Sequence, residues 1–131
     1  MIKKRKPLIL KDPKEINSLN YLNDLAVKKI EEGDYPQAIE ILVALIKKHP
    51  NYFLAYYNLG NLHLSLEQWQ QAVFYFKEAI AIDDLHARSY LGLAIALSRL
   101  GKHEEAMIYY KKAYEIDPSV KTIALPPDLF G

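Results

Sequence analysis

The sequence predicts an all-α protein built from three helical hairpins, and three observations support this. A shift of 34 residues places the chain on itself without a gap. Within each unit, apolar residues recur at the three- and four-residue spacing of a helix, in two separate runs. A break between the runs carries Gly33 or Gly101, which suits the end of a helix. The predicted repeats are residues 19–52, 53–86 and 87–120.

The repeat rests on residues of the same type at intervals of 34 positions. The matching sets include Leu25, Leu59 and Leu93; Ala38, Ala72 and Ala106; Tyr56 and Tyr90; and Pro50 and Pro118. At 131 residues the chain has the usual size of one domain. About three repeats are the smallest number that buries a continuous core. We therefore expect one compact domain with the minimum number of units.

A basic extension, residues 1–18, precedes the first unit. Its run Lys3–Lys6 reads KKRK, and we expect a solvated, disordered tail there. Such a run also suits phosphate groups, an anionic membrane or nuclear import. The apolar stretch Leu8–Leu10 is too short for the core of a signal peptide. The segment after the basic run is expected to begin a short helix or to lie along the first repeat.

Each unit is expected to form a helix, a tight turn and a second helix. The apolar positions of the third unit are Tyr90, Leu93, Ala94 and Leu97, then Met107, Tyr110, Ala113 and Tyr114. Unit two has Glu67 in place of the turn glycine and Asp84 in place of the closing proline. These two departures weaken boundaries of unit two without changing the period.

The C-terminal tail, residues 121–131, is expected to be non-helical because it contains Pro126 and Pro127. It therefore cannot supply the polar-faced helix that commonly covers the last repeat of such stacks. Three residues of the last helix would then lack a cover: Met107, Tyr110 and Tyr114. Either the tail folds back as an extended cap or the exposed surface pairs with another chain. The residues available for such a cap are Ile123, Leu125, Leu129 and Phe130.

The period and the residue pattern resemble the tetratricopeptide repeat family, over residues 19–120. In unit two the resemblance is carried by Tyr56, Leu59, Gly60, His63, Ala72, Phe76 and Ala79. It implies a right-handed superhelical stack of three helix-turn-helix hairpins, in which small residues such as Gly60 let helices approach closely. It also implies a concave groove, lined by the first helix of every unit, that holds a segment of a partner protein.

By this resemblance, the groove is lined by the face of each first helix that does not pack against neighbouring helices. The expected partner-binding residues are Asn23, Val27, Ile30, Tyr57, Asn58, Asn61, Leu64, Arg88, Leu91, Ile95 and Arg99. The same faces also carry Asn20, Leu54, Gly92 and Ser98. The apolar members suit an amphipathic helix or an extended segment with apolar anchors.

The pair Asn58 and Asn61 is unusual, because asparagine is a poor helix former and these two lie on one helix face. An amide both donates and accepts hydrogen bonds, so the pair suits the backbone of a bound segment of any sequence. The alternative is that Asn58 is a common residue of the repeat and Asn61 a solvated surface residue.

Some chaperone-binding members of the family grip a peptide's terminal carboxylate with lysine, asparagine and arginine side chains. The matching positions here are Asn23, Val27, Asn58, Arg88 and Gly92, of which only Asn58 keeps the family's residue. We therefore expect no carboxylate clamp.

Composition and motifs favour a binding module over an enzyme. The 17 basic and 16 acidic residues do not point to nucleic acid or a membrane as the obligate partner. Cysteine is absent, and no phosphate-binding loop or nucleophile motif is present. The cluster Asp83, Asp84 and His86 is expected to end a repeat, and His63 to be a satisfied packing residue. We expect no catalytic residue, cofactor, metal or membrane span, and a cytoplasmic location.

The sequence thus predicts a protein–protein interaction module, an adaptor or assembly factor that binds a peptide or amphipathic helix of another protein. The alternative is a self-assembling, homo-oligomeric scaffold that uses the C-terminal tail or the uncapped last repeat.

Overall fold

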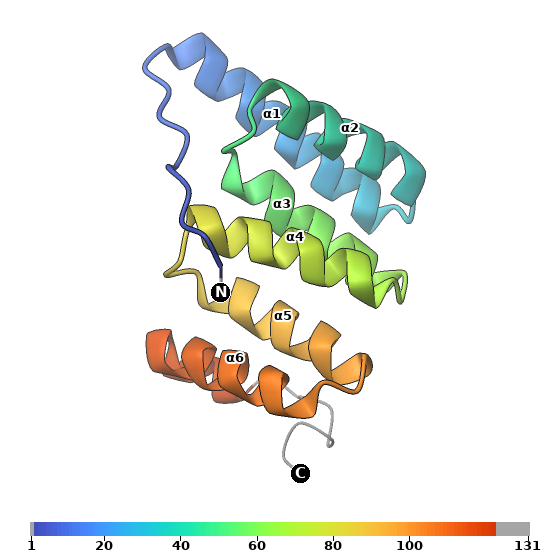
Figure 1. The fold of residues 1–131 in the computed structure, drawn as a ribbon. Helices are drawn as coiled ribbons and strands as arrows, with labels where there is room; N and C mark the ends of the chain where they lie inside the picture. Colours follow the sequence, from blue (N-terminus) through green and yellow to red (C-terminus); the bar gives the residue numbers. More distant parts are fainter. Residues whose placement is uncertain (1, 123–131) are drawn as a thin grey trace.

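In the computed structural model, which describes residues 2–122, the chain forms six α-helices and a short 3-10 helix (Figure 1). They are α1 (Pro13–Glu31), α2 (Tyr35–Lys48), α3 (Phe53–Ser65), α4 (Trp69–Ile82), α5 (Ala87–Arg99), α6 (His103–Ile116) and η1 (Pro118–Thr122). Consecutive α-helices pair into three antiparallel hairpins. Residues 2–122 contain no β-strand, and the predicted all-α stack of hairpins is confirmed.

Local caps set the first two helix starts. The Asp12 side chain accepts a hydrogen bond from the Lys14 backbone N–H at 2.9 Å, and Pro13 takes the first helical position. Asp34 caps α2 in the same way, accepting from the Gln37 N–H at 3.3 Å. Because aspartate followed by proline is a strong start signal, α1 begins before residue 19 and is the longest helix described.

The three turns within hairpins share one backbone geometry although their residues differ. Gly33 and Gly101 have φ of 81°, and Glu67 at the equivalent position has φ of 58°. In each turn a backbone N–H bonds back to the last helical turn, as Asp34 N–H does to the Lys29 carbonyl at 2.8 Å. The left-handed conformation costs energy for a residue with a side chain. Unit two therefore keeps the turn despite Glu67.

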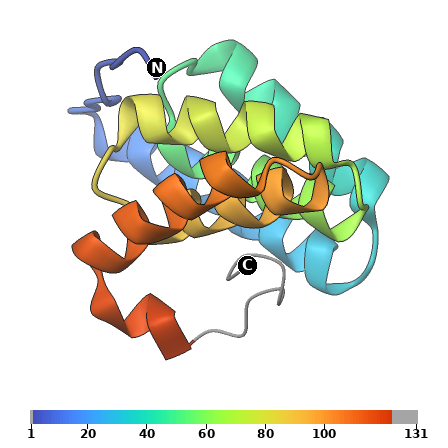
Figure 2. The ribbon, with the colours of Figure 1, turned by 60° about the horizontal axis from the view of Figure 1, so that its bottom comes forward.

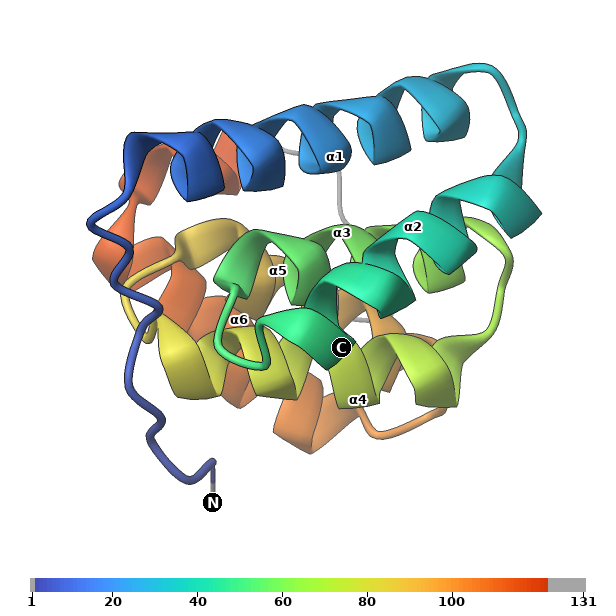
Figure 3. The ribbon, with the colours of Figure 1, turned by 90° about the horizontal axis from the view of Figure 1, so that it is seen from above.

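The first helices of the hairpins form the inner layer of the stack. The backbones of α1 and α3, and those of α3 and α5, approach within 8 Å between Cα atoms, whereas those of α2, α4 and α6 do not. Because the first helices lie closer together, the stack curves toward them. Figures 2 and 3 show the same layers from two further directions. The concave side of the described chain is thus lined by α1, α3 and α5.

Phe76 of α4 is fully buried where two hairpins meet. A Cβ atom on Gly60 would lie 2.7 Å from Phe76 Cε1, and a Cβ atom on Gly92 would lie 2.3 Å from Phe76 Cζ. The expected role of Gly60 in close approach is confirmed. The assignment of Gly92 to the groove was wrong, because its backbone packs on the Phe76 ring.

A tyrosine hydroxyl links neighbouring hairpins at each junction. Tyr56 donates to the Pro50 carbonyl at 2.7 Å, and Tyr90 donates to the Asp84 carbonyl at 2.9 Å. The two hydrogen bonds are one repeat apart. Since the acceptor is a backbone carbonyl, aspartate replaces proline at position 84 without loss of the link.

The N-terminal residues 2–10, here called the N-terminal strap, run in an extended course along the edge where one hairpin connects to the next (Figure 1). Arg5 is partly buried and hydrogen-bonds Asn51, whereas Lys3, Lys4 and Lys6 are exposed. The expectation of a solvated, disordered basic tail is therefore wrong for Arg5. A guanidinium presents several donors in a fixed plane, so it finds protein acceptors where lysines stay in water.

After α6 the chain turns back as η1, which contacts α5 and α6. Val120 of η1 is buried in the same core cluster as Tyr110, and Met107 packs against that cluster. The expected lack of cover is therefore wrong for Tyr110, because η1 returns an apolar side chain to this end of the core. The two alternatives for Ile123, Leu125, Leu129 and Phe130 lie outside the described residues.

Glu67→Gly is expected to raise the free energy of unfolding by about 1 kcal/mol, since glycine adopts positive φ without a steric cost from Cβ. Urea denaturation followed by circular dichroism measures this. Gly101→Ala, at the equivalent turn, is the reciprocal variant and should lower the same quantity. A loss of stability in Glu67→Gly would show that the Glu67 side chain contributes more than its backbone conformation costs.

Gly92→Ala is expected to lower the free energy of unfolding by about 1–3 kcal/mol, because the new methyl group overlaps the Phe76 ring. Thermal and urea unfolding provide the measurement. In a Phe76→Leu background the same substitution should cost less, since the smaller side chain leaves room. An equal cost in both backgrounds would argue against the overlap as the cause.

Candidate functional site

The inner helices present the surface that we call the groove face, made of the expected partner-binding residues on α1, α3 and α5. Seven of its residues are partly exposed: Val27, Ile30, Tyr57, Asn58, Asn61, Leu64 and Ile95. Asn23 and Leu91 are buried, and Arg88 and Arg99 are exposed. The face is therefore a mainly apolar surface with amides at its centre.

Asn58 forms a hydrogen bond across the groove face. Its Nδ2 donates to Asn23 Oδ1 at 2.8 Å, which joins α3 to α1. Asn23 is buried, so this bond satisfies a polar group that water reaches poorly. The bond explains why a poor helix former occupies position 58. It also leaves the Asn58 carbonyl and the Asn23 amino group for a further partner.

Asn61 lies one helical turn after Asn58 and is partly exposed. Its side chain forms no hydrogen bond with another residue of the part that the structure describes. Val27 and Ile30 are partly exposed on α1, in the neighbouring row of the same layer. The structure thus leaves an amide and two aliphatic side chains available on adjacent helices.

Tyr57 belongs to a cluster of rings at the junction of the second and third hairpins. Its ring centroid lies 4.6 Å from that of His86 and 6.2 Å from those of Phe53 and Phe76. His86 also contacts Phe53 edge-on, at 4.7 Å between centroids. This packing fixes the position of Tyr57 on the groove face.

Leu64, Leu91 and Ile95 meet on one apolar cluster between α3 and α5. Leu91 is only 5% exposed, so it offers a partner little surface. Leu64 and Ile95 remain partly exposed and form the apolar part of the face near the third hairpin.

The two arginines of the face do not form a joint site. They stand at opposite ends of α5, about 16 Å apart at 1.5 Å rise per residue. The Arg99 guanidinium lies over the Trp69 ring of α4, 5.7 Å from its centroid. Arg88 is exposed near the start of α5, and its positive charge helps to lower the pKa of His86. Each arginine therefore acts alone.

Asp83, His86 and His63 make contacts within the fold. Asp83 Oδ1 accepts from the Leu85 N–H at 3.1 Å, and His86 caps α5. His63 Nδ1 lies 2.6 Å from Gln68 Oε1. Residues 2–122 hold no group of three side chains placed to bind a metal ion. In the same residues, no helix combines the length and apolarity needed to cross a membrane.

A cavity of about 690 Å³ lies beneath the N-terminal strap, and the sequence did not indicate it. We call it the strap cavity. Its walls come from the strap, the start of α1, the start of α3 and the end of α4. Asn20 and Leu54, both on the expected groove faces, also line it. The cavity therefore adjoins the groove face.

The family model for the tetratricopeptide repeat matches residues 23–85 and residues 60–120. The two matches overlap and together span most of the chain. The chain belongs to the tetratricopeptide repeat family.

Among curated proteins, this tetratricopeptide repeat chain is similar to the small glutamine-rich tetratricopeptide repeat-containing protein 2 of Saccharomyces cerevisiae. The two are 36% identical over 101 residues, which cover 77% of this chain and 29% of that protein. The chain spans less than a third of the length of the first curated relatives it matches. The similarity is therefore to the repeat region of larger proteins.

Solved structures share the tetratricopeptide fold. The Yersinia enterocolitica type III secretion chaperone SycD, in complex with a peptide of the translocator YopD, has a TM-score of 0.75 and 22% identity. The match covers 80% of this chain and 82% of SycD. The first repeat domain of Spaghetti (RPAP3), bound to an HSP90 peptide, has a TM-score of 0.73 and 22% identity, over 76% of this chain and 79% of that one.

His86 is expected to make the stability of this tetratricopeptide stack depend on pH. Its Nδ1 accepts a hydrogen bond from the Ser89 backbone N–H at 3.2 Å, which requires an unprotonated Nδ1. Burial lowers the pKa of His86 from the usual 6.5; Asp83 opposes this shift and Arg88 adds to it. Below pH about 6.5 the unfolded chain therefore takes up a proton that the folded chain does not.

The contribution of His86 to the free energy of unfolding is thus expected to stay constant above pH about 6.5 and to decrease as the pH falls through that value. Urea titrations between pH about 5 and 8 measure the slope. His86→Asn keeps an N-cap acceptor without a titrating group, so its slope should be smaller. His49→Asn is the matched control for the removal of an imidazole. An unchanged slope in His86→Asn would refute the assignment.

Proposed function

We propose that this chain is a protein-interaction module of the cytoplasm, an adaptor or assembly factor that holds a segment of a partner protein against the groove face. The observation that carries the proposal is the surface itself. Apolar side chains flank an amide pair on three adjacent helices, and most of these groups are partly exposed. Such a surface suits an extended segment or an amphipathic helix with apolar anchors.

The structural neighbours support this mode of binding. SycD is in complex with a YopD peptide, and the RPAP3 domain is bound to the HSP90 peptide SRMEEVD. Both neighbours share the fold with this chain. The positions of a carboxylate clamp keep only Asn58 of the family's residues here. We therefore propose a partner segment that is recognised along its length, not by its terminal carboxylate.

Binding would rest on a preorganised surface. The Asn23–Asn58 bond and the ring packing of Tyr57 hold the face in one arrangement before a partner arrives. A rigid surface loses little conformational freedom on binding, so more of the contact energy appears as affinity. Asn61 is placed to bond the partner's backbone, and Val27, Ile30 and Ile95 to contact its apolar side chains.

The double variant Val27→Ala with Asn61→Ala is expected to weaken binding of a selected peptide by about tenfold or more, because both side chains belong to the proposed interface. The probe is a peptide selected on the wild-type protein from a phage-displayed library of random peptides. Fluorescence anisotropy of the labelled peptide measures Kd.

The matched control for the groove variant is Phe74→Ala with Ile108→Ala. These two exposed apolar residues lie on α4 and α6, outside the inner layer. The control should bind the peptide within about twofold of wild type, a difference below 1 kcal/mol. Circular dichroism must show equal helicity in all proteins. Equal affinity of the groove variant and the control would contradict the proposal.

Self-association is the second candidate function. It is favoured by the exposure of Phe74 and Ile108, which are 57% and 65% exposed on the outer helices. These two side chains would give a second chain apolar surface to pack against. Sedimentation velocity at rising protein concentration separates the two candidates, since only self-association makes the mass depend on concentration.

A further inference from the structure

The N-terminal strap is bonded to the body at several points. The Arg5 backbone N–H donates to the Ala81 carbonyl, and the Leu8 N–H donates to the Asn51 carbonyl at 3.2 Å. Lys4 Nζ lies 3.2 Å from Asp84 Oδ2. The strap therefore bridges the loop between the first two hairpins and the end of α4.

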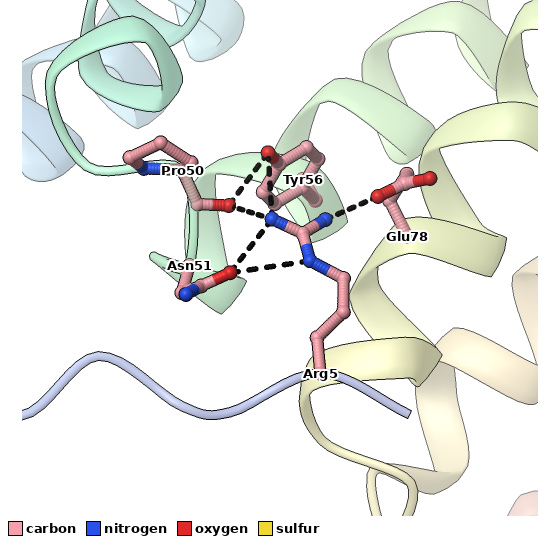
Figure 4. A network of polar contacts seen from close by, with 5 residues as sticks. All are labelled: Arg5, Pro50, Asn51, Tyr56 and Glu78. Carbon is pink, nitrogen blue, oxygen red and sulfur yellow. Dashed lines mark hydrogen bonds and ion pairs between the residues drawn. The ribbon is translucent and has the colours of Figure 1, made fainter. Parts of the chain in front are cut away.

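Arg5 is the main side-chain anchor of the strap (Figure 4). Its Nη2 donates to Asn51 Oδ1 at 2.7 Å and its Nε donates to the same oxygen at 3.1 Å. The guanidinium also contacts the Pro50 carbonyl and the Glu78 carboxylate, and lies over the Tyr56 ring. These acceptors converge on one planar cation, which a lysine could not satisfy.

The acceptor site for Arg5 occurs at only one of the two described hairpin junctions. One repeat later, Leu85 stands in place of Asn51 and Lys112 in place of Glu78. A leucine accepts no side-chain hydrogen bond, and a lysine repels an arginine. The strap is therefore specific for the junction between the first and second hairpins.

The strap cavity lies between the anchored strap and the helices. Its apolar lining includes Leu8 and Leu10 of the strap, Ile16 and Leu19 of α1, and Phe53 and Leu54 of α3. Its volume of about 690 Å³ has room for a bulky side chain. Two ion pairs neutralise charges at the rim, Lys4 with Asp84 and Arg5 with Glu78. The lining also contains Asp83, which accepts a hydrogen bond from the Leu85 N–H, and Lys6, which is exposed. The apolar part of the lining thus suits an uncharged apolar group.

We infer that the strap cavity receives a bulky apolar side chain of the same partner segment that the groove face binds, with the N-terminal strap as one wall. The inference rests on the proposed function and adds a second contact to it. It is supported by continuity, since Asn20 and Leu54 belong both to the expected groove faces and to the cavity lining. The partner segment would therefore carry a leucine-like or aromatic anchor near one end.

Filling the cavity tests the inference. Leu8→Trp adds bulk from the strap and Ile16→Trp from α1. Each is expected to raise Kd for the library-selected peptide by about tenfold, the loss of one buried apolar side chain. Ile9→Trp and Tyr21→Trp are the matched controls, because Ile9 and Tyr21 are 80% and 66% exposed and do not line the cavity. The controls should bind within about twofold of wild type.

Removing the Arg5 side chain, which fixes the strap to the body, tests the inference without adding bulk to the cavity. Arg5→Ala frees the strap and is expected to weaken peptide binding several-fold, and Arg5→Lys should not restore it. Lys3→Ala, whose side chain is exposed and does not line the cavity, should leave binding unchanged. In the selected peptide, replacing the bulky apolar residue by alanine should weaken binding to wild type but not weaken it further in Leu8→Trp.

The outcomes separate this inference from the proposed function. If the groove variant loses the peptide while both cavity-filling variants and Arg5→Ala bind normally, the inference is overturned and the groove function stands. If the library yields no peptide, or the groove variant binds as wild type does, the proposed function fails. Loss of binding in the controls as well would mean that the cavity is not the site of the anchor.

Discussion

The Phe76 ring sets the distance between neighbouring hairpins. It is fully buried on α4 and meets Gly60 of its own hairpin and Gly92 of the next. Because neither glycine has a Cβ atom, α3 and α5 approach the ring closely enough for the inner helices to contact one another. The groove face is formed by those inner helices. The part of the groove face between α3 and α5 therefore depends on the contact of the two glycines with the Phe76 ring.

The fold was predictable because its information is present three times in the sequence. The 34-residue period predicted even the turn at Glu67, although the residue type alone argues against a left-handed conformation there. The contacts between hairpins were harder to predict from the sequence. Gly92 matched a groove position by its place in the repeat, and only the tertiary arrangement puts Phe76 against it. Periodicity thus defines the helices better than it defines what each residue touches.

The candidate site shows the same limit more strongly. The groove face could be listed from the repeat, but the Asn23–Asn58 bond depends on the distance between α1 and α3. Arg5 lies outside the repeats, and its bonds reach residues 46 and 73 positions away. Arg5 differs from the lysines beside it in residue type, but the local sequence does not show which acceptors its guanidinium would meet. A run of basic residues is usually solvated. This run is anchored through Arg5 because Asn51, Glu78 and the Pro50 carbonyl all lie within reach of its guanidinium.

The strap also has a consequence for how the stack opens. In a linear stack each hairpin contacts mainly its neighbours, so local unfolding can begin at either end and spread inward. Arg5 precedes the first hairpin and is bonded to Glu78 near the end of the second. Detachment of the first hairpin together with the strap therefore breaks the bonds of Arg5 to the second hairpin as well. The strap thus couples the opening of the first hairpin to the second.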